Sequence, residues 1–204
     1  MVFWGEKDST ISFCEGAYVK SDYIAEYYNS LTGLIYSLVG IYFLKTKLWR
    51  MSYTLIFLGI GTVLLHATQR WYGQYIDELS MLYLSFQIIE YLRMKQHRTT
   101  SQLWIPLGLS IYLHNYNLIF LFIFSACQAY ILFYLKKPRP HMHCEITAAV
   151  YNYMYKYLFL FSFLLWIIDH ICGENIQKYY LHAWWHIGTG LSIFFGLNEL
   201  LLCE

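Results

Sequence analysis

Charged residues are scarce in this chain, and their scarcity excludes most soluble folds. Only 13% of its 204 residues are Asp, Glu, Lys or Arg, whereas a typical soluble domain has about 25%. Three prolines and 12 glycines are too few for a disordered linker or a collagen-like fibre. A net charge of +1 argues against a protein that binds nucleic acid through its phosphates. Five scattered cysteines are too few for a small disulfide-framework protein.

Long hydrophobic segments take the place of the missing charges. Hydrophobic residues make up 58% of the chain and aromatic residues 21%. A membrane-spanning helix needs about 20 mostly apolar residues; six segments reach or approach this length, and a seventh, the fourth along the chain, is shorter. They cover residues 23–44, 51–68, 74–92, 103–113, 117–135, 153–171 and 179–202. The pattern predicts an all-α integral membrane protein with seven transmembrane helices. We expect one domain over residues 1–204, with an N-terminal segment at 1–22 and a helical bundle at 23–203.

The division between the fourth and fifth segments depends on a short polar turn. Only His114, Asn115 and Tyr116 separate them, so the two segments could also form one long helix. About 32 residues is too long for one ordinary span, and the polar residues favour a tight turn. We therefore expect two helices here.

Basic residues set the expected orientation. Ten of the 14 Lys and Arg residues follow the first, third and fifth segments or lie near them, and the other four lie on the opposite side. Because cytoplasmic loops carry the excess of positive charge, we expect the N-terminus outside or in a lumen and the C-terminus in the cytosol. The chain does not begin with a basic segment followed by a short apolar core, so we expect no cleavable signal peptide.

Ionisable side chains near the outer ends of four expected helices form the candidate site. With the orientation above, Glu26, His66, Asp77, His182 and His186 lie at similar depth. Such groups are costly within a membrane and usually serve a function. We therefore expect these five side chains to meet in space.

The pair His182 and His186 is the sharpest local pattern. Side chains four residues apart share one face of a helix, and His66 can supply a third imidazole. Three histidines with an open fourth position are typical of catalytic zinc, which lowers the pKa of a bound water to about 7. The alternative is interfacial histidines, amphipathic like the neighbouring tryptophans. The similar depth of His66 and Asp77 favours the metal site.

Asp77 and Thr62 are the candidate catalytic residues. Asp77 can act as a general base for water and then as an acid for a leaving amine. The alternative is an acidic residue favoured by the dipole at a helix N-terminus. Thr62 lies one turn before His66 and could donate to a developing oxyanion. Its alternative is a hydrogen bond back to its own helix.

A second group of metal-ligand residue types occurs in the loop expected in the cytosol. It consists of His141, His143, Cys144 and Glu145. A membrane thickness separates this loop from the other histidines, so we do not assign it to the candidate site.

Longer motifs connect these candidates to a known family. They are WG at 4–5, STISFCE at 9–15, YIAEYYN at 23–29, GTVLLHAT at 61–68, QYIDELSM at 74–81 and HAWWH at 182–186. Their order and their places on the expected helices resemble the alkaline ceramidases, within the wider group of seven-span hydrolases that includes the adiponectin receptors.

The resemblance implies a zinc amidase that hydrolyses ceramide to sphingosine and a fatty acid. It assigns His66, His182 and His186 to zinc and Asp77 to the water. The family has serine where this chain has Thr62, which keeps the hydroxyl but adds a methyl group. We expect a monomer in the endoplasmic reticulum or Golgi membrane, with the site toward the lumen.

The family also binds calcium near the N-terminus. The matching positions here are Ser12, Phe13 (through its carbonyl), Glu15, Ala17 and Glu26. The family has aspartate at the Ser12 position and asparagine at the Ala17 position, so this chain lacks two ligand side chains. Because calcium takes six to eight oxygen ligands, any calcium affinity should be weak.

The resemblance also pairs Cys14 with Cys172 in a disulfide. The expected topology places both cysteines on the outer side, where conditions are oxidising. The alternative is two unpaired thiols. Cys127 is expected within a span, and Cys144 and Cys203 in the cytosol, so we expect these three to be free.

Two other functions remain open from the sequence. A receptor-like lipid-binding relative would keep the fold and metal but have little turnover, which the Thr62 position and the reduced calcium site would explain. A bis-histidine haem membrane protein is the other alternative, and its strong visible absorption would distinguish it from a zinc protein.

Overall fold

The computed structural model describes residues 3–94, 117–134 and 145–202, and within these ranges all regular secondary structure is helical. The long helices are α1 (Tyr27–Phe43), α2 (Trp49–Thr68), α3 (Trp71–Met94), α5 (Asn117–Tyr134), α6 (Glu145–His170) and α8 (Leu181–Leu202). A short helix, α7 (Glu174–Gln177), precedes α8. The predicted all-α class is confirmed for the described residues. The helix expected at 103–113 lies outside the described residues.

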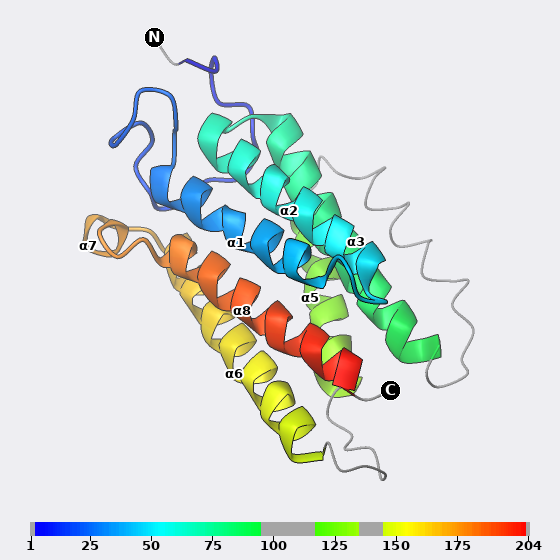
Figure 1. The fold of residues 1–204 in the computed structure, drawn as a ribbon. Helices are drawn as coiled ribbons and strands as arrows, with labels where there is room; N and C mark the ends of the chain where they lie inside the picture. The colour runs from blue at the N-terminus through cyan, green and yellow to red at the C-terminus, as the bar shows by residue number, and fades with distance from the viewer. Residues whose placement is uncertain (1–2, 95–116, 135–144, 203–204) are drawn as a thin grey trace.

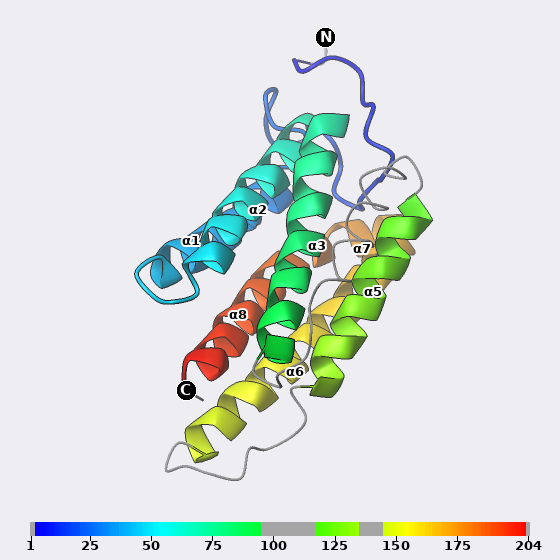
Figure 2. The same ribbon diagram turned by 90° about the vertical axis from the view of Figure 1, so that its right-hand side faces the viewer.

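The long helices pack side by side in the order α6, α8, α1, α2, α3 and α5. Figures 1 and 2 show this arrangement from two directions. The N-terminal segment crosses the end of the bundle where α2 meets α3 (Figure 1). Fully buried apolar side chains fill the interior, among them Phe43, Leu55, Leu82, Ile131 and Leu197. Burial of these side chains, each from a different helix, holds the bundle together.

Two glycines let α1, α2 and α3 approach closely near the candidate site. A Cβ atom at Gly33 would lie 2.6 Å from the Thr62 side chain. A Cβ atom at Gly61 would lie 2.7 Å from the backbone nitrogen of Asp77. Small residues at helix crossings allow such close contact. The two crossings therefore position Thr62 beside Asp77.

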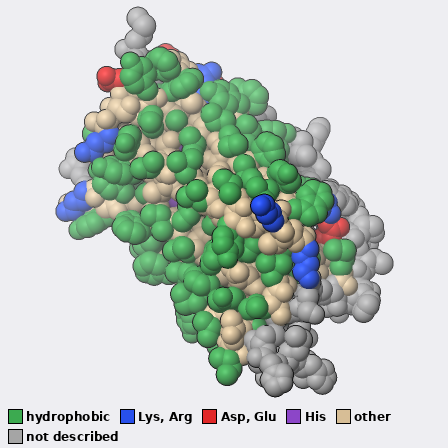
Figure 3. Space-filling model, in the orientation of Figure 1, with side chains coloured by type: hydrophobic (Ala, Val, Ile, Leu, Met, Phe, Trp, Pro, Cys, Tyr) green, Lys and Arg blue, Asp and Glu red, His purple; other side chains and the backbone are tan. Residues whose placement is uncertain are grey.

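Large apolar side chains cover much of the outer surface of the bundle. On α6 the exposed ones follow one helical face: Ile146, Val150, Tyr153, Met154, Tyr157, Leu160, Phe161, Leu164 and Ile167. On α1 and α2 they include Leu31, Leu34, Leu38, Ile41, Tyr42, Trp49, Tyr53, Phe57 and Ile60. Figure 3 shows hydrophobic side chains over much of one face. Apolar patches of this extent are typical of surfaces that contact lipid or another protein. By length and hydropathy, one of the described helices, α2, is a candidate to cross a membrane.

The sequence predicts a turn around Trp71 and Gly73, between the segments at 51–68 and 74–92, and this prediction is wrong. The chain turns instead at Gln69, whose φ of 54° is left-handed, and α3 begins at Trp71. Oδ1 of Asp8 accepts a hydrogen bond of 2.7 Å from the Trp71 backbone N–H. This contact satisfies a donor in the first turn of α3, so the helix can begin two residues before Gly73.

Two other expected boundaries shift for equally local reasons. Helix α1 begins at Tyr27 because the backbone N–H groups of Ala25 and Glu26 donate to the carbonyls of Ala67 and His66 (2.9 Å each). These bonds hold residues 25–26 as extended chain against α2. Helix α6 begins at Glu145, before the expected start at 153, because its apolar face continues through Ile146 and Val150.

Candidate metal and active site

Three histidines from two distant parts of the chain meet at one end of the bundle. His66 lies in the last turn of α2, and His182 and His186 occupy successive turns at the start of α8. All three are buried, with exposed fractions of 1%, 4% and 3%. Their candidate ligand nitrogens all lie within 4.8 Å of one another. The trio expected from the sequence is therefore assembled here.

Hydrogen bonds at Nδ1 orient two of the imidazoles. Oε2 of Glu26 lies 2.5 Å from Nδ1 of His66, and Oγ1 of Thr32 lies 3.1 Å from Nδ1 of His186. A partner at one ring nitrogen sets the tautomer and leaves the other nitrogen for a metal. Nδ1 of His182 is buried and has no hydrogen-bond partner among the described residues. Three buried imidazoles, two of them pre-oriented, are a donor set that fits zinc.

The spacing of the three rings argues against the haem interpretation. Their centroids lie 4.6–5.0 Å apart around one point. Two axial histidines of a haem instead lie on opposite faces of a flat macrocycle. These rings approach one another too closely for a macrocycle to lie between any two of them.

Asp77 from α3 contributes to the same site. The Thr62 hydroxyl contacts Oδ1 of Asp77 and lies 2.8 Å from the carbonyl oxygen of Leu58. Because a hydroxyl has only one proton to donate, Thr62 donates either to Asp77 or to the Leu58 carbonyl, and not to both at once. The hydrogen bond back to its own helix, considered above as the alternative for Thr62, is present. The geometry favours Thr62 as a partner of Asp77 over Thr62 as an oxyanion donor.

Four of the candidate residues, Thr62, Asp77, His182 and His186, line a cavity of about 340 Å³. Its polar end carries Asp77, Glu78, His182 and His186, and its remaining walls include Phe13, Met81, Phe124, Trp166 and Trp185. A deeper apolar cavity of about 60 Å³ shares some of these walls, namely Tyr36, Met81, Phe124 and Trp185. The polar end at the histidines and the apolar interior beyond it suit a lipid that carries a polar group.

Residues 8–16 form what we call the N-terminal strap, which covers the histidines. The Phe13 ring lies 3.9 Å from the His182 ring and 4.7 Å from the His66 ring, between centroids. Thr10, Ile11 and Ser12 of the strap also line the cavity. The strap therefore shields two of the histidines from solvent.

Several contacts fasten the strap to different helices. Its Cys14 forms a disulfide with Cys172, after the end of α6. The Cys14 backbone N–H donates to Oδ2 of buried Asp169 on α6 (3.1 Å). Glu15 accepts hydrogen bonds of 2.8 Å from the backbone N–H groups of Tyr28 and Asn29 on α1. These contacts fix the position of Phe13 over the site.

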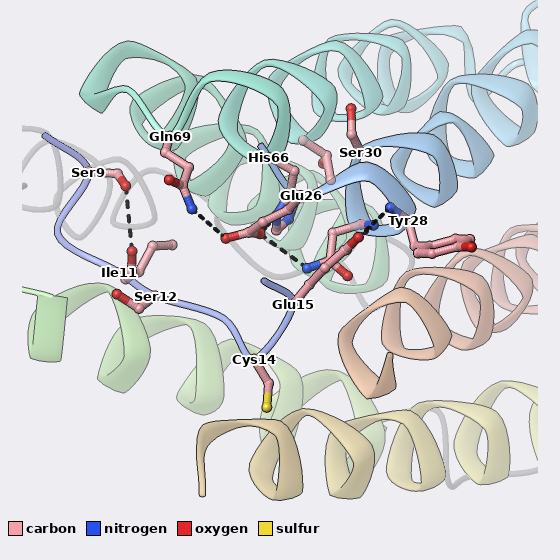
Figure 4. A network of polar contacts seen from close by, with 12 residues as sticks. Ser9, Ile11, Ser12, Cys14, Glu15, Glu26, Tyr28, Ser30, His66 and Gln69 are labelled. Atoms are coloured by element: carbon pink, nitrogen blue, oxygen red, sulfur yellow. Dashed lines mark hydrogen bonds and ion pairs between the residues drawn. The ribbon is translucent and has the colours of Figure 1, made fainter. Parts of the chain in front are cut away.

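The residues matched to the calcium site do not fit that ion. Both oxygens of Glu15 accept the α1 hydrogen bonds just described, and burial raises the pKa of Glu15 above its ordinary value despite them. Oε1 of Glu26 accepts from Gln69 Nε2 (2.8 Å), and Oε2 faces His66 and Asn29 Nδ2. Figure 4 shows Gln69 and His66 converging on Glu26.

The other calcium positions are also unsuitable. Oγ of Ser12 lies 2.5 Å from Nζ of Lys7, a cation of the chain itself. Ala17 has no side-chain oxygen. A calcium ion needs several free oxygens, many of them charged, and protein donors already engage the two carboxylates. We therefore assign no calcium to this site.

Sequence reasoning missed several residues that support the histidines. Thr32 and Gln69 are ordinary polar residues whose roles depend on partners distant in sequence. Asp169 is different, because it is an acidic residue near the outer end of an expected span. The rule that selected Glu26 would have selected Asp169 as well. Of the separate loop group, residues 141–144 lie outside the described ranges, and Glu145 begins α6.

Comparisons with known proteins identify the family of this chain. The sequence profile of the family described as "Ceramidase" matches residues 5–203. "Alkaline ceramidase 3" of Mus musculus is 28% identical over 93% of this chain and 82% of its own length. "Putative alkaline ceramidase dcd3A" of Dictyostelium discoideum is 25% identical over 98% of this chain and 88% of its own. "Alkaline ceramidase YPC1" of Saccharomyces cerevisiae is 41% identical over 39% of this chain and 28% of its own. The chain therefore belongs to the ceramidase family of amide-bond hydrolases.

Proposed function

We propose that this protein is a zinc-dependent membrane ceramidase that releases sphingosine and a fatty acid from ceramide. The observation that carries the proposal is the grouping of His66 with His182 and His186 beside a largely apolar cavity that His182, His186 and Asp77 line. Membership of the ceramidase family indicates the reaction, and the cavity suits a substrate with a polar amide and long chains.

The histidines would hold the metal, and Asp77 would move the proton. Zinc bound there would polarise the amide carbonyl and lower the pKa of a bound water. Asp77 would accept a proton from the attacking water and pass it to the leaving nitrogen as the carbon–nitrogen bond breaks. Water and the amide thus yield a free amine and a carboxylic acid.

Thr62 would position Asp77. Its hydroxyl contacts Oδ1 of Asp77, and the close approach of Gly61 to the Asp77 backbone fixes the distance between the two helices. Serine, which the family has at this position, would provide the same hydroxyl. The methyl group of Thr62 lies against Gly33, so it is accommodated away from Asp77.

The membrane setting belongs to the same proposal. The exposed apolar faces of α1, α2 and α6 support insertion into a bilayer. We propose seven spans with the N-terminus lumenal and the C-terminus cytosolic, in the endoplasmic reticulum or Golgi. We also propose that residues 1–204 act as one monomeric domain.

Purified protein incubated with a panel of ceramides tests the function. We expect sphingosine release that stops when a chelator removes the metal and returns when zinc is added. A receptor-like protein would instead bind ceramide with negligible sphingosine release under every condition. That second result would refute the proposal.

A further inference from the structure

The chemistry proposed above leaves one buried carboxylate of the cavity without a role. Glu78 follows Asp77 on α3, is only 3% exposed, and lines the same cavity. A carboxylate within a lipid-facing bundle is costly and usually serves a function. Because Asp77 already accounts for proton transfer, we look for a different role for Glu78.

The position of Glu78 is fixed from outside the cavity. Nε2 of Gln74, one turn earlier on α3, lies 2.8 Å from Oε1 of Glu78. Gln74 is itself 2% exposed, and its Oε1 accepts hydrogen bonds from the backbone N–H and hydroxyl of Thr10 (2.8 and 3.0 Å). This relay runs from the N-terminal strap to the cavity wall, so the carboxylate is held in one orientation.

We propose that Glu78 binds the hydroxyl groups of the sphingoid portion of the substrate. The inference rests on the proposed function, since it requires a ceramide as substrate. In ceramide the amide nitrogen is attached to a carbon flanked by two hydroxyl-bearing carbons. With the amide at Asp77 and the histidines, those hydroxyls lie a few bond lengths away. Glu78, which follows Asp77 on α3, is therefore within reach of these hydroxyls.

The chemistry of the two groups matches. A carboxyl oxygen accepts hydrogen bonds, and each substrate hydroxyl has a proton to donate. A buried acceptor that bonds a substrate hydroxyl discriminates against an analogue that lacks this hydroxyl, because the hydrogen bond is then lost. Glu78 therefore gives the enzyme a preference for sphingoid amides over simple fatty amides.

The test compares ceramide with analogues that lack either the 1-hydroxyl or the 3-hydroxyl, using the zinc-loaded full chain. The parent should prefer ceramide over at least one analogue by about 10- to 100-fold in kcat/KM. Glu78→Ala should reduce that preference to within about threefold, mainly through loss of activity on ceramide. Glu78→Gln, which keeps the shape of the side chain, should reduce the preference for ceramide by a smaller factor. Glu199→Gln, on the distant part of α8, is the matched control and should keep the full preference.

Equal losses on ceramide and on both analogues in the Glu78 variants would overturn the inference, because a structural role would not depend on substrate hydroxyls. A parent with no preference for ceramide over either analogue would overturn it as well. If Glu78→Ala does not fold, the preference measured for Glu78→Gln decides. If the parent releases no sphingoid base from any substrate, the proposed function fails, and this inference fails with it.

Discussion

Oε2 of Glu26, the residue before α1, lies 2.5 Å from Nδ1 of His66 in the last turn of α2. The same carboxylate accepts a hydrogen bond from Gln69 and another from Asn29. These contacts orient the imidazole and leave its other nitrogen for a metal shared with His182 and His186. The carboxylate is thus a support for the histidine site.

Glu26→Gln should weaken zinc binding without removing a ligand. The amide keeps the shape of the side chain but lacks the charge that makes the imidazole a stronger donor, so zinc affinity should fall about 10- to 100-fold. Competition with a chelator of known affinity measures the change. Exposed Glu6 provides the control variant Glu6→Gln, which should bind zinc as the parent does. Equal affinities in parent and Glu26→Gln would contradict the supporting role.

Replacing any of His66, His182 or His186 with alanine should remove most of the bound zinc, because a site with two protein ligands is rarely tight. Metal analysis of purified protein should give one zinc per chain for the parent. His170→Ala is a matched control, since His170 lines the same cavity but bonds to the Trp166 carbonyl.

The loop variants His141→Ala and His143→Ala should also keep the zinc. Zinc lost from these loop variants and retained in the three site variants would show that the metal lies elsewhere.

Removal of calcium should leave zinc content and turnover unchanged. Protein donors already engage both carboxylates of the candidate calcium site. In Gln69→Glu, zinc content and turnover should depend on calcium. The reason is that a second carboxylate beside Glu26 favours a cation between the two. Zinc content measured with and without calcium in both proteins is the readout. A parent that loses zinc or activity when only calcium is removed would contradict the assignment.

Peptide mapping without reductant should recover Cys14 joined to Cys172. Loss of this bond should lower the free energy of unfolding by about 2–5 kcal/mol, because it closes a long loop. Cys14→Ser and Cys172→Ser should have the same effect, and combining them should add nothing further. Recovery of both cysteines as free thiols would count against the pairing and against a shared lumenal location.

The candidate site was more predictable than the fold around it. His66, Asp77, His182 and His186 are costly residues in apolar helices, so composition and helix polarity alone identify them. Glu26 follows from the same reasoning, and its proximity to His66 was expected. Its hydrogen bond from Gln69 was not, because that contact depends on how the chain before α1 packs against the end of α2. The turn at Gln69 escaped prediction since the cap on α3 comes from Asp8, more than 60 residues earlier.

The most direct test of the central claim is Asp77→Asn, with zinc content and ceramide turnover measured on the same preparation. Asp77 carries protons in this account and holds no metal. The variant should therefore keep its zinc and lose about 100- to 10,000-fold in kcat. Thr62→Ser, which keeps the hydroxyl beside Asp77, is the control and should stay active, whereas Thr62→Ala should be slower. An Asp77→Asn protein that turns over ceramide at the rate of the parent would contradict the mechanism.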